Sequence, residues 1–225
     1  MPYRRTDNVV RKANARHDAI LAAVRSIAAE GGMAAVQIAA VAERAGIAAG
    51  TVYRYFPSKT ELVVMLVDTL VREELTTLRQ AADSAPGPLS ALAAAMTAFA
   101  ARALAERRLA FAMLAEPVEP EIDAARRGYR AAIAGELERC IGAALAAGRL
   151  PDQNAAVAAS AIMGAVSEGL LGPLAPKPGE TAAETLAAVQ AITLFGLRAL
   201  GVVDARARGL VVQARMPMMI GRVST

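Results

Sequence analysis

The stretch QIAAVAERAGIAAGTVYRYFPSK, residues 37–59, decides how this chain folds. Two short helical segments, at about 37–45 and 48–55, flank a single glycine at position 46. That spacing is typical of a helix-turn-helix unit, in which two helices meet at a steep angle across a short turn. The angle is expected to be fixed by small alanines between the helices and by the apolar side chains of Ile38, Val41, Ile47 and Val52.

The second of these helices has the side chains of a DNA-reading helix. Its first turn exposes small residues that let a helix enter a major groove about 12 Å wide, namely Ala48, Ala49, Gly50 and Thr51. Donors for phosphate oxygens follow it: Tyr53, Arg54 and then Lys59, at the start of the next helix. Because alanine cannot donate or accept a hydrogen bond, base reading is expected from Thr51, Gln37 and DNA shape.

The segment AGIAAGTVYRYFPSKTEL, residues 45–62, closely resembles the signature of the tetracycline-repressor (TetR) family. The strong resemblance covers about residues 16–65, and its matching positions are Ala45, Gly46, Ile47, Gly50, Thr51, Val52, Tyr53, Tyr55, Phe56, Ser58, Lys59 and Leu62. It implies that Thr51, Tyr53, Arg54 and Lys59 hold phosphates and that residues 48–50 face the groove. Tyr55 and Phe56 are expected to pack in the core. Members often carry threonine or serine where Val36 precedes Gln37, so Gln37 is expected to act as the donor there.

Apolar residues recur at helical spacing along the rest of the chain, and no strand pattern interrupts them. The fold class expected is all-α, with about nine helices: an N-terminal three-helix helix-turn-helix DNA-binding domain followed by a helical ligand-binding and dimerisation bundle. The expected organisation is a basic flexible arm (1–13), the DNA-binding domain (14–60), the ligand-binding and dimerisation domain (61–203) and an irregular basic tail (204–225). The first helix is expected to begin at about Asn14.

The composition excludes several classes of protein. Of the 225 residues, 55 are alanine, so the high mean hydropathy reflects methyl groups rather than a membrane span. With no export signal, a cytoplasmic protein is expected. A single cysteine, Cys140, and a single histidine, His17, exclude a disulfide and leave no set of side chains for a histidine-based catalytic or metal site. We therefore expect no enzyme, no cofactor and no metal, a buried Cys140 and a surface His17.

Charge is divided along the chain. Residues 1–61 carry nine basic and five acidic residues, a net charge of +4. Residues 62–200 carry twelve basic and fifteen acidic residues (net −3), and residues 201–225 carry four basic residues and one acidic residue (net +3). A basic head on a mildly acidic body suits binding to nucleic acid. The arm, through Arg4, Arg5, Arg11 and Lys12, is expected either to enter a minor groove or only to improve solubility.

The body is expected to pair two copies and to hold an effector. The expected homodimer interface is made by two stripes of the last helices, including Ala161, Ile162, Ala165, Val189, Thr193, Gly196 and Leu197; these stripes could instead complete the monomer core. The expected pocket for an unknown small-molecule effector is lined by Met96, Phe99, Phe111, Leu114, Tyr129, Met163 and Glu168, although a core role or, for Glu168, an exposed position is the alternative. Arg126 and Arg127 are expected on a solvated face.

Together these features predict a sequence-specific regulator of transcription that binds a near-palindromic operator in double-stranded DNA. By family default it is a repressor, released by a small, largely apolar ligand that shifts the population of its two states. The alternatives are a helical enzyme or small-molecule-binding protein acting on a hydrophobic substrate, and a non-specific DNA-compacting protein. No membrane is expected as a partner.

Overall fold

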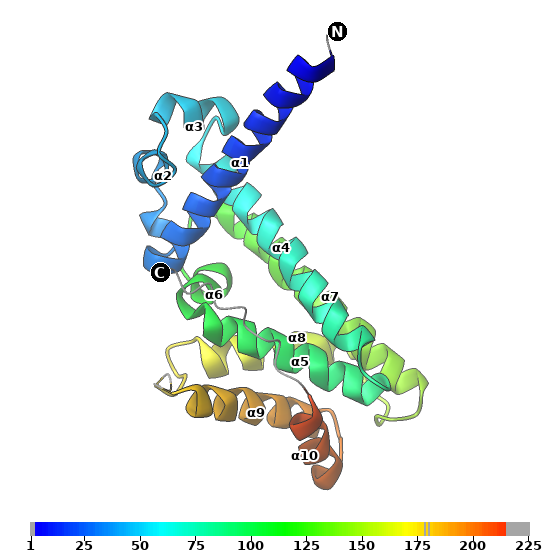
Figure 1. The fold of residues 1–225 in the computed structure, drawn as a ribbon. Helices are drawn as coiled ribbons and strands as arrows, with labels where there is room; N and C mark the ends of the chain where they lie inside the picture. Colours follow the sequence, from blue (N-terminus) through cyan, green and yellow to red (C-terminus); the bar gives the residue numbers. More distant parts are fainter. Residues whose placement is uncertain (1–2, 178, 180, 215–225) are drawn as a thin grey trace. The chain divides into compact units, whose positions relative to one another are not determined.

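A computed structural model describes residues 3–177, 179 and 181–214, with side chains from residue 10 onward. In this part of the chain there are ten α-helices, one short 3₁₀ turn and no strand, so the all-α prediction is confirmed (Figure 1). The helices divide between two compact units, and the chain passes from one unit to the other after Leu70, Arg107 and Tyr129.

Unit 1 comprises Met1–Leu70 and Arg108–Tyr129. Its elements are α1 (Tyr3–Gly31), η1 (Met33–Ala35), α2 (Ile38–Arg44), α3 (Ala49–Tyr55), the first half of α4 (Lys59–Asp83), α6 (Arg107–Leu114) and the start of α7 (Pro120–Ala146). The apolar stripe of α1 buries Ile20, Val24 and Ile27, as helical spacing predicts. The domain boundary expected at residue 60 differs from this division, because α6 and the start of α7 belong to the same unit as the helix-turn-helix.

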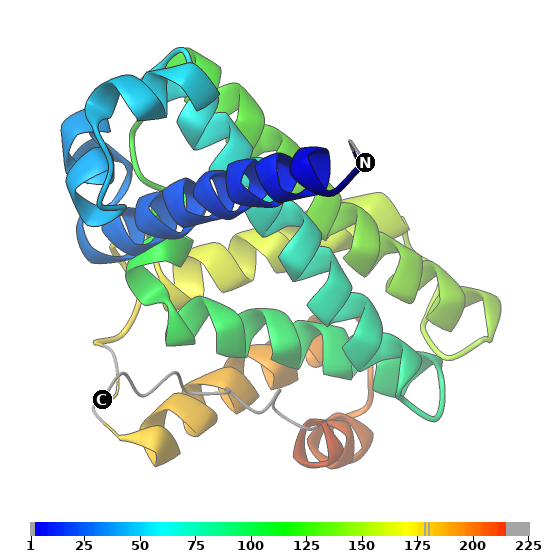
Figure 2. The same cartoon turned by 45° about the horizontal axis from the view of Figure 1, so that its top comes forward.

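Unit 2 comprises Val71–Arg107 and Arg130–Thr225. Here α5 (Pro88–Ala105) packs along α9 (Ala182–Ala199), α8 (Ala155–Leu170) packs against both, and α10 (Asp204–Gln213) covers α5 and α9 (Figure 2). Helix α5 is long and apolar enough to cross a membrane, but two thirds of its residues (67%) are buried in the unit. That burial is typical of the core helix of a globular bundle.

Two expectations at the ends of the chain are wrong. Helix α1 begins at Tyr3 rather than near Asn14, so residues 3–13 are helical. Residues 204–213, expected to be irregular, form α10, which buries Ala207, Leu210 and Val211. Its first turn is held by Asp204, which pairs with Arg198 and Arg208. Residues 215–225 of the expected tail lie outside the described residues.

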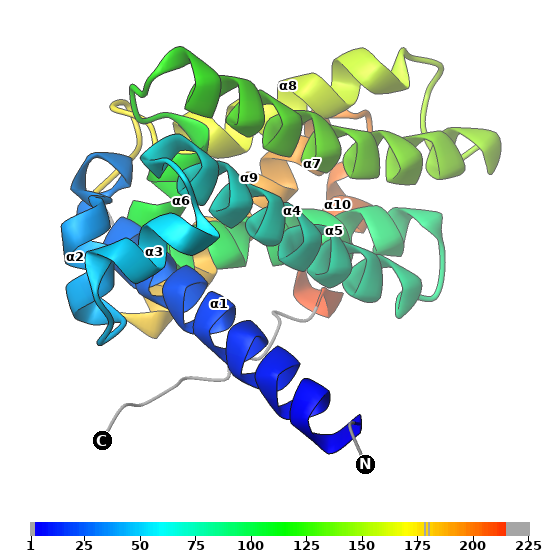
Figure 3. The ribbon, with the colours of Figure 1, turned by 90° about the horizontal axis from the view of Figure 1, so that it is seen from above.

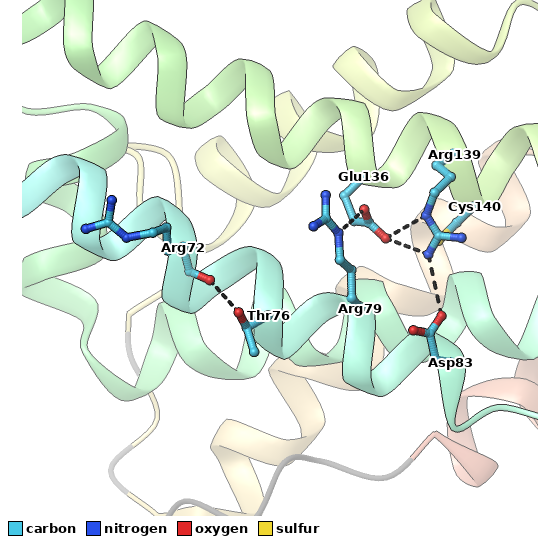
Figure 4. Close-up of polar contacts among 7 residues, drawn as sticks. All are labelled: Arg72, Thr76, Arg79, Asp83, Glu136, Arg139 and Cys140. Atoms are coloured by element: carbon cyan, nitrogen blue, oxygen red, sulfur yellow. Dashed lines mark hydrogen bonds and ion pairs between the residues drawn. The ribbon is translucent and has the colours of Figure 1, made fainter.

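A buried acid joins α4 to α7 within unit 2. The Glu136 carboxylate accepts hydrogen bonds from Arg79 Nε (3.0 Å) and Arg139 Nη2 (2.6 Å), and Arg139 also pairs with Asp83 (Figure 4). Burial disfavours the charged form of Glu136, but the two guanidinium groups outweigh it, so its pKa lies below the usual range. Cys140 is buried beside this cluster as expected, and burial raises the pKa of its thiol, which makes it a poor nucleophile.

The predicted dimer stripe of α9 faces inward instead. Val189, Thr193 and Leu197 are fully buried, and Thr193 Oγ1 lies 3.4 Å from Thr97 Oγ1 of α5. A Cβ added at Gly196 would lie 2.2 Å from Met96 Cε, so a residue without a side chain is required where α9 crosses α5. Ile162 of α8 is also buried. Of the seven residues predicted for the dimer interface, Ala161 is exposed, Ala165 is half-buried and the other five are buried.

The exposed apolar side chains of α8 and α9 lie elsewhere on these helices. Val157 is 66% exposed, and on α9 Leu186 and Phe195 are 39% and 55% exposed. The sequence alone could not separate these faces, because alanine-rich helices such as these carry apolar residues on every side.

Candidate nucleic-acid interface

A left-handed turn at Gly46 sets the angle between α2 and α3. Gly46 has φ of +66°, a conformation that glycine adopts at little cost. The Gly46 amide donates to Glu43 O (3.1 Å) and the Ile47 amide to Ala42 O (3.0 Å), which ends α2 with the hydrogen bonds of a Schellman motif. Val41 and Val52 are fully buried between the two helices. The turn predicted from the sequence is therefore present, and of the predicted apolar residues Ile38, Val41 and Val52 are buried while Ile47 is half-buried.

The side chains predicted to contact DNA lie on one exposed surface of unit 1. Gln37, Ala48, Ala49, Gly50, Tyr53 and Arg54 are exposed, while Thr51 and Lys59 are half-buried. Tyr53 is 52% exposed, an unusual position for a large aromatic side chain without a partner surface. No side chain lies within 4 Å of a Cβ added at Gly50, so the first turn of α3 is unobstructed. This surface can accept a polyanion.

Gln37 does not cap α2. Its Nε2 donates to Ala34 O (3.2 Å), and no side-chain hydrogen bond caps the helix that follows it. Ser58, predicted to start α4, does accept a hydrogen bond from the Glu61 amide (3.1 Å). The capping at the start of α4 therefore follows the sequence pattern, whereas the role expected of Gln37 would require its side chain to turn.

The ammonium group of Lys59 already has an acidic neighbour within unit 1. Lys59 Nζ lies 3.7 Å from Glu119 Oε1, and the Glu119 side chain is 58% exposed. A carboxylate at this position partly neutralises the lysine and repels phosphate. Glu119 is 60 residues from Lys59 in the sequence, so no local pattern indicates that the two residues meet.

Two contacts join α1 to the helix-turn-helix. Arg44 of α2 donates to both oxygens of Glu30 on α1 (2.7 and 2.9 Å), and these hydrogen bonds, with one from Ser26, lower the pKa of Glu30 to about 2. His17, expected only at the surface, is half-buried and stacks on Phe56 with 5.3 Å between ring centroids. Phe56 is buried, as expected, whereas Tyr55, also expected in the core, is half-buried. His17 therefore fixes the end of α3 against α1.

Glu116 ties the segment after α6 to the end of α1. Its Oε2 accepts from the Met33 amide (3.0 Å) and from Arg108 (3.2 Å), while Arg108 also donates to Gly31 O (2.9 Å). Gly32 between them has φ of +79°, and a Cβ there would lie 1.9 Å from Arg108 Nη2. Burial disfavours the charged form of Glu116, but the amide and guanidinium hydrogen bonds outweigh it and lower its pKa.

Arg126 holds the same segment from α7, which corrects the solvated position expected for it. It is 3% exposed, and its Nη1 donates to Ala112 O (2.6 Å) at the end of α6 and to Glu116 O. Arg127 is exposed, as expected. These long-range contacts between arginines and the ends of α1 and α6 carry no sequence signal, because each partner is more than a helix turn away in the chain.

The seven residues predicted to line an effector pocket do not share one unit. Phe111, Leu114 and Tyr129 belong to unit 1, and Met96, Phe99, Met163 and Glu168 belong to unit 2. Met96, Phe99 and Met163 are buried in unit 2, whereas Glu168 is exposed and accepts a hydrogen bond from the Leu174 amide (3.4 Å). Glu168 thus anchors the turn after α8. A groove of about 280 Å³ in unit 2 contains none of the seven; its lining includes Leu104, Arg107, Lys177, Ile192 and Phe195.

Comparison with known proteins finds relatives of the segment that carries this surface. Residues 20–66 match the model of the bacterial regulatory proteins, tetR family. Over these residues, about a fifth of its length, the chain is similar to the regulators of that family. A stretch of 58 residues is 55% identical to the HTH-type transcriptional repressor KstR of Rhodococcus jostii, and a stretch of 49 residues is 59% identical to KstR of Mycolicibacterium smegmatis. These stretches are 26% and 22% of this chain and 26% and 24% of the relatives, so the chain matches about a quarter of their length.

Solved structures show that a likeness in fold extends over most of this chain. FadR from Bacillus subtilis, in complex with stearoyl-CoA, aligns with a TM-score of 0.70 and 16% identity over 83% of this chain and 99% of its own. RolR without ligand aligns with a TM-score of 0.62 and 22% identity over 89% and 98%. At this level of identity the likeness concerns the fold alone.

Replacing Glu119 should strengthen binding to DNA. Glu119→Gln removes the negative charge beside Lys59, and a surface charge pair of about 0.2–1 kcal/mol corresponds to a gain in affinity of up to about fivefold. Fluorescence anisotropy with a 30-base-pair duplex at low salt measures it. Glu121→Gln, an exposed residue two positions along, is the matched control for net charge. Equal effects of the two substitutions would contradict the Lys59–Glu119 contact.

Replacing Glu116 should weaken unit 1 in a pH-dependent way. Glu116→Gln loses the ion pair with Arg108 and should lower the free energy of unfolding at pH 7 by about 1–3 kcal/mol. Because the folded-state pKa is lowered, this stabilisation is present above the unfolded-state pKa of about 4.3 and is lost as the pH falls through the folded-state value. Urea unfolding followed by far-UV circular dichroism between pH 3 and pH 7 measures the difference.

The exposed Glu138 of α7 provides the control for this experiment, as Glu138→Gln. The gap between the wild type and the Glu116 variant should close toward pH 3. A gap that stayed constant over the whole pH range would show that the charge of Glu116 does not contribute.

Proposed function

We propose that this chain is a sequence-specific DNA-binding regulator of transcription, and that it acts as a repressor. The observation that carries the proposal is the exposed α3 surface, where small residues precede Tyr53 and Arg54, within the segment 20–66 that matches the model of the bacterial regulatory proteins, tetR family. In a TetR-family chain this surface suits the major groove, with residues 48–50 against the bases and Thr51, Tyr53, Arg54 and Lys59 on phosphates. Gln37 would turn from Ala34 O to a phosphate.

Two copies are needed to recognise a site of useful length, because one helix contacts only a few base pairs. We propose a homodimer that uses the exposed faces of α8 and α9, with Val157, Leu186 and Phe195 as its apolar residues. Ala161 lies on the exposed surface of α8 and permits close helix approach there. A near-palindromic operator, with half-sites about one helical turn apart, follows from such a pair.

The proposed effector is a small, largely apolar molecule that binds within unit 2. Met96, Phe99 and Met163 are buried there, and methionine side chains adapt readily to the shape of an apolar ligand. Structures of similar fold were solved with resorcinol (RolR) and with stearoyl-CoA (FadR), so this fold admits ligands of different size. Binding would shift the population of the dimer away from the state that fits the operator.

The proposal is tested by selection from a library of random-sequence duplexes with the full-length protein. An inverted repeat should be enriched, and the enriched duplex should bind at least a thousandfold more tightly than random duplex at moderate salt. Equal affinity for both would favour a DNA-compacting protein, and the absence of binding would contradict the proposal.

Single substitutions connect that binding to α3. Tyr53→Ala and Lys59→Ala should each weaken binding of the enriched duplex by about tenfold, because each removes a donor to phosphate. Lys177→Ala, which removes an exposed lysine from unit 2, is the control and should leave affinity unchanged. Equal affinities for all three variants would show that α3 does not contact DNA.

A further inference from the structure

Between residues 10 and 16, the part of α1 that precedes His17 buries none of its described side chains. We call residues 3–16 the basic extension. Val10 is 52% exposed, Arg11, Lys12 and Asn14–Arg16 are exposed, and Ala13 is half-buried. From residue 10 onward, the first buried residue of α1 is Ile20. Because short helices without a packed face are marginal in water, burial does not account for this one.

Charge distinguishes the basic extension from the rest of the chain. Its fourteen residues contain Arg4, Arg5, Arg11, Lys12 and Arg16 against one acid, Asp7, so they carry a net charge of +4, equal to the formal net charge of the entire protein. Among the described residues none forms an ion pair with Arg11, Lys12 or Arg16. Lys12 and Arg16 are one helical turn apart, which places both charges on one side of α1.

The basic extension starts where α3 ends. His17, the next residue of α1, stacks on Phe56 directly after α3 and lies 6.5 Å from the ring of Tyr55. Beyond this contact α1 continues past α3, as Figure 3 shows for these elements of unit 1. Fourteen helical residues span about 21 Å at 1.5 Å per residue. Duplex DNA presents a phosphate charge about every 1.7 Å along its axis, so several phosphates lie within reach of such a length.

We propose that the basic extension binds the phosphate backbone of the duplex that α3 contacts, outside the groove that α3 occupies. The inference rests on the proposed function. The contacts are to phosphate, because Arg11, Lys12 and Arg16 are exposed along a helix, and exposed arginine and lysine side chains donate to the phosphate oxygens of a duplex. The basic extension therefore adds affinity and salt dependence without adding sequence preference.

The test compares the full-length wild type with the variant Arg11→Gln/Lys12→Gln/Arg16→Gln. Affinities for the selected duplex and for a random duplex, each with 15 flanking base pairs on both sides, are measured between 0.05 and 0.3 M KCl. The slope of log K against log [KCl] should become less steep by about 0.9 for each phosphate that the variant no longer neutralises, or about 2.7 per protomer. Affinity at 0.15 M KCl should fall by about tenfold or more for both duplexes.

The matched control removes the same charge from unit 2: Arg149→Gln/Lys177→Gln/Arg206→Gln, all exposed positions. The control should keep the wild-type slope, and thermal unfolding should show both variants folded. If the basic-extension variant had the same salt slope as the control, the inference would be overturned. The proposed function would still stand in that case, provided that the wild type preferred its selected duplex over random duplex. If the basic-extension variant no longer preferred the selected duplex over random duplex, the inference would also be overturned, because contacts to phosphate carry no sequence preference. A wild type that bound no duplex would overturn both.

Discussion

The positive φ of Gly46 is the constraint on which the candidate interface depends. It ends α2 after seven residues, at Arg44, and α3 begins five residues later, at Ala49, with Val41 of α2 and Val52 of α3 both fully buried. A side chain at this position would strain the backbone even though the space around it is open. With the turn fixed, the first turn of α3 and the ring of Tyr53 face outward because the opposite side of α3 is occupied by its core contact.

The rest of unit 1 holds that geometry through charged groups as well as through its core. Arg44 and Glu30 join α2 to α1, His17 and Phe56 join α1 to the end of α3, and Glu116 with Arg108 joins α6 to the end of α1. A change in the position of α6 would therefore act on the chain segment around Gly32, six residues before the start of α2 at Ile38. This provides a physical route by which α6 can affect the recognition helix.

The sequence predicted the features that depend on neighbouring residues. The turn at Gly46, the cap at Ser58, the buried Phe56 and the all-α fold all follow from local spacing, and the structure contains each of them. It did not predict the pairs Lys59–Glu119 and Arg108–Gly31, whose members are 60 and 77 residues apart. The sequence also does not indicate which face of α9 is buried, because alanines around the helix leave the hydrophobic pattern weak. Gly196 marks the buried face only when the structure places Met96 beside it.

The central claim is that α3 lies in the major groove of duplex DNA, and methylation interference on the selected duplex tests it most directly. Dimethyl sulfate modifies guanine N7 in the major groove and adenine N3 in the minor groove. If α3 binds as proposed, guanine N7 methylation blocks binding in two clusters whose centres are about one helical turn, 10–10.5 base pairs, apart. Binding that is blocked only by adenine N3 methylation, or by neither modification, would contradict it.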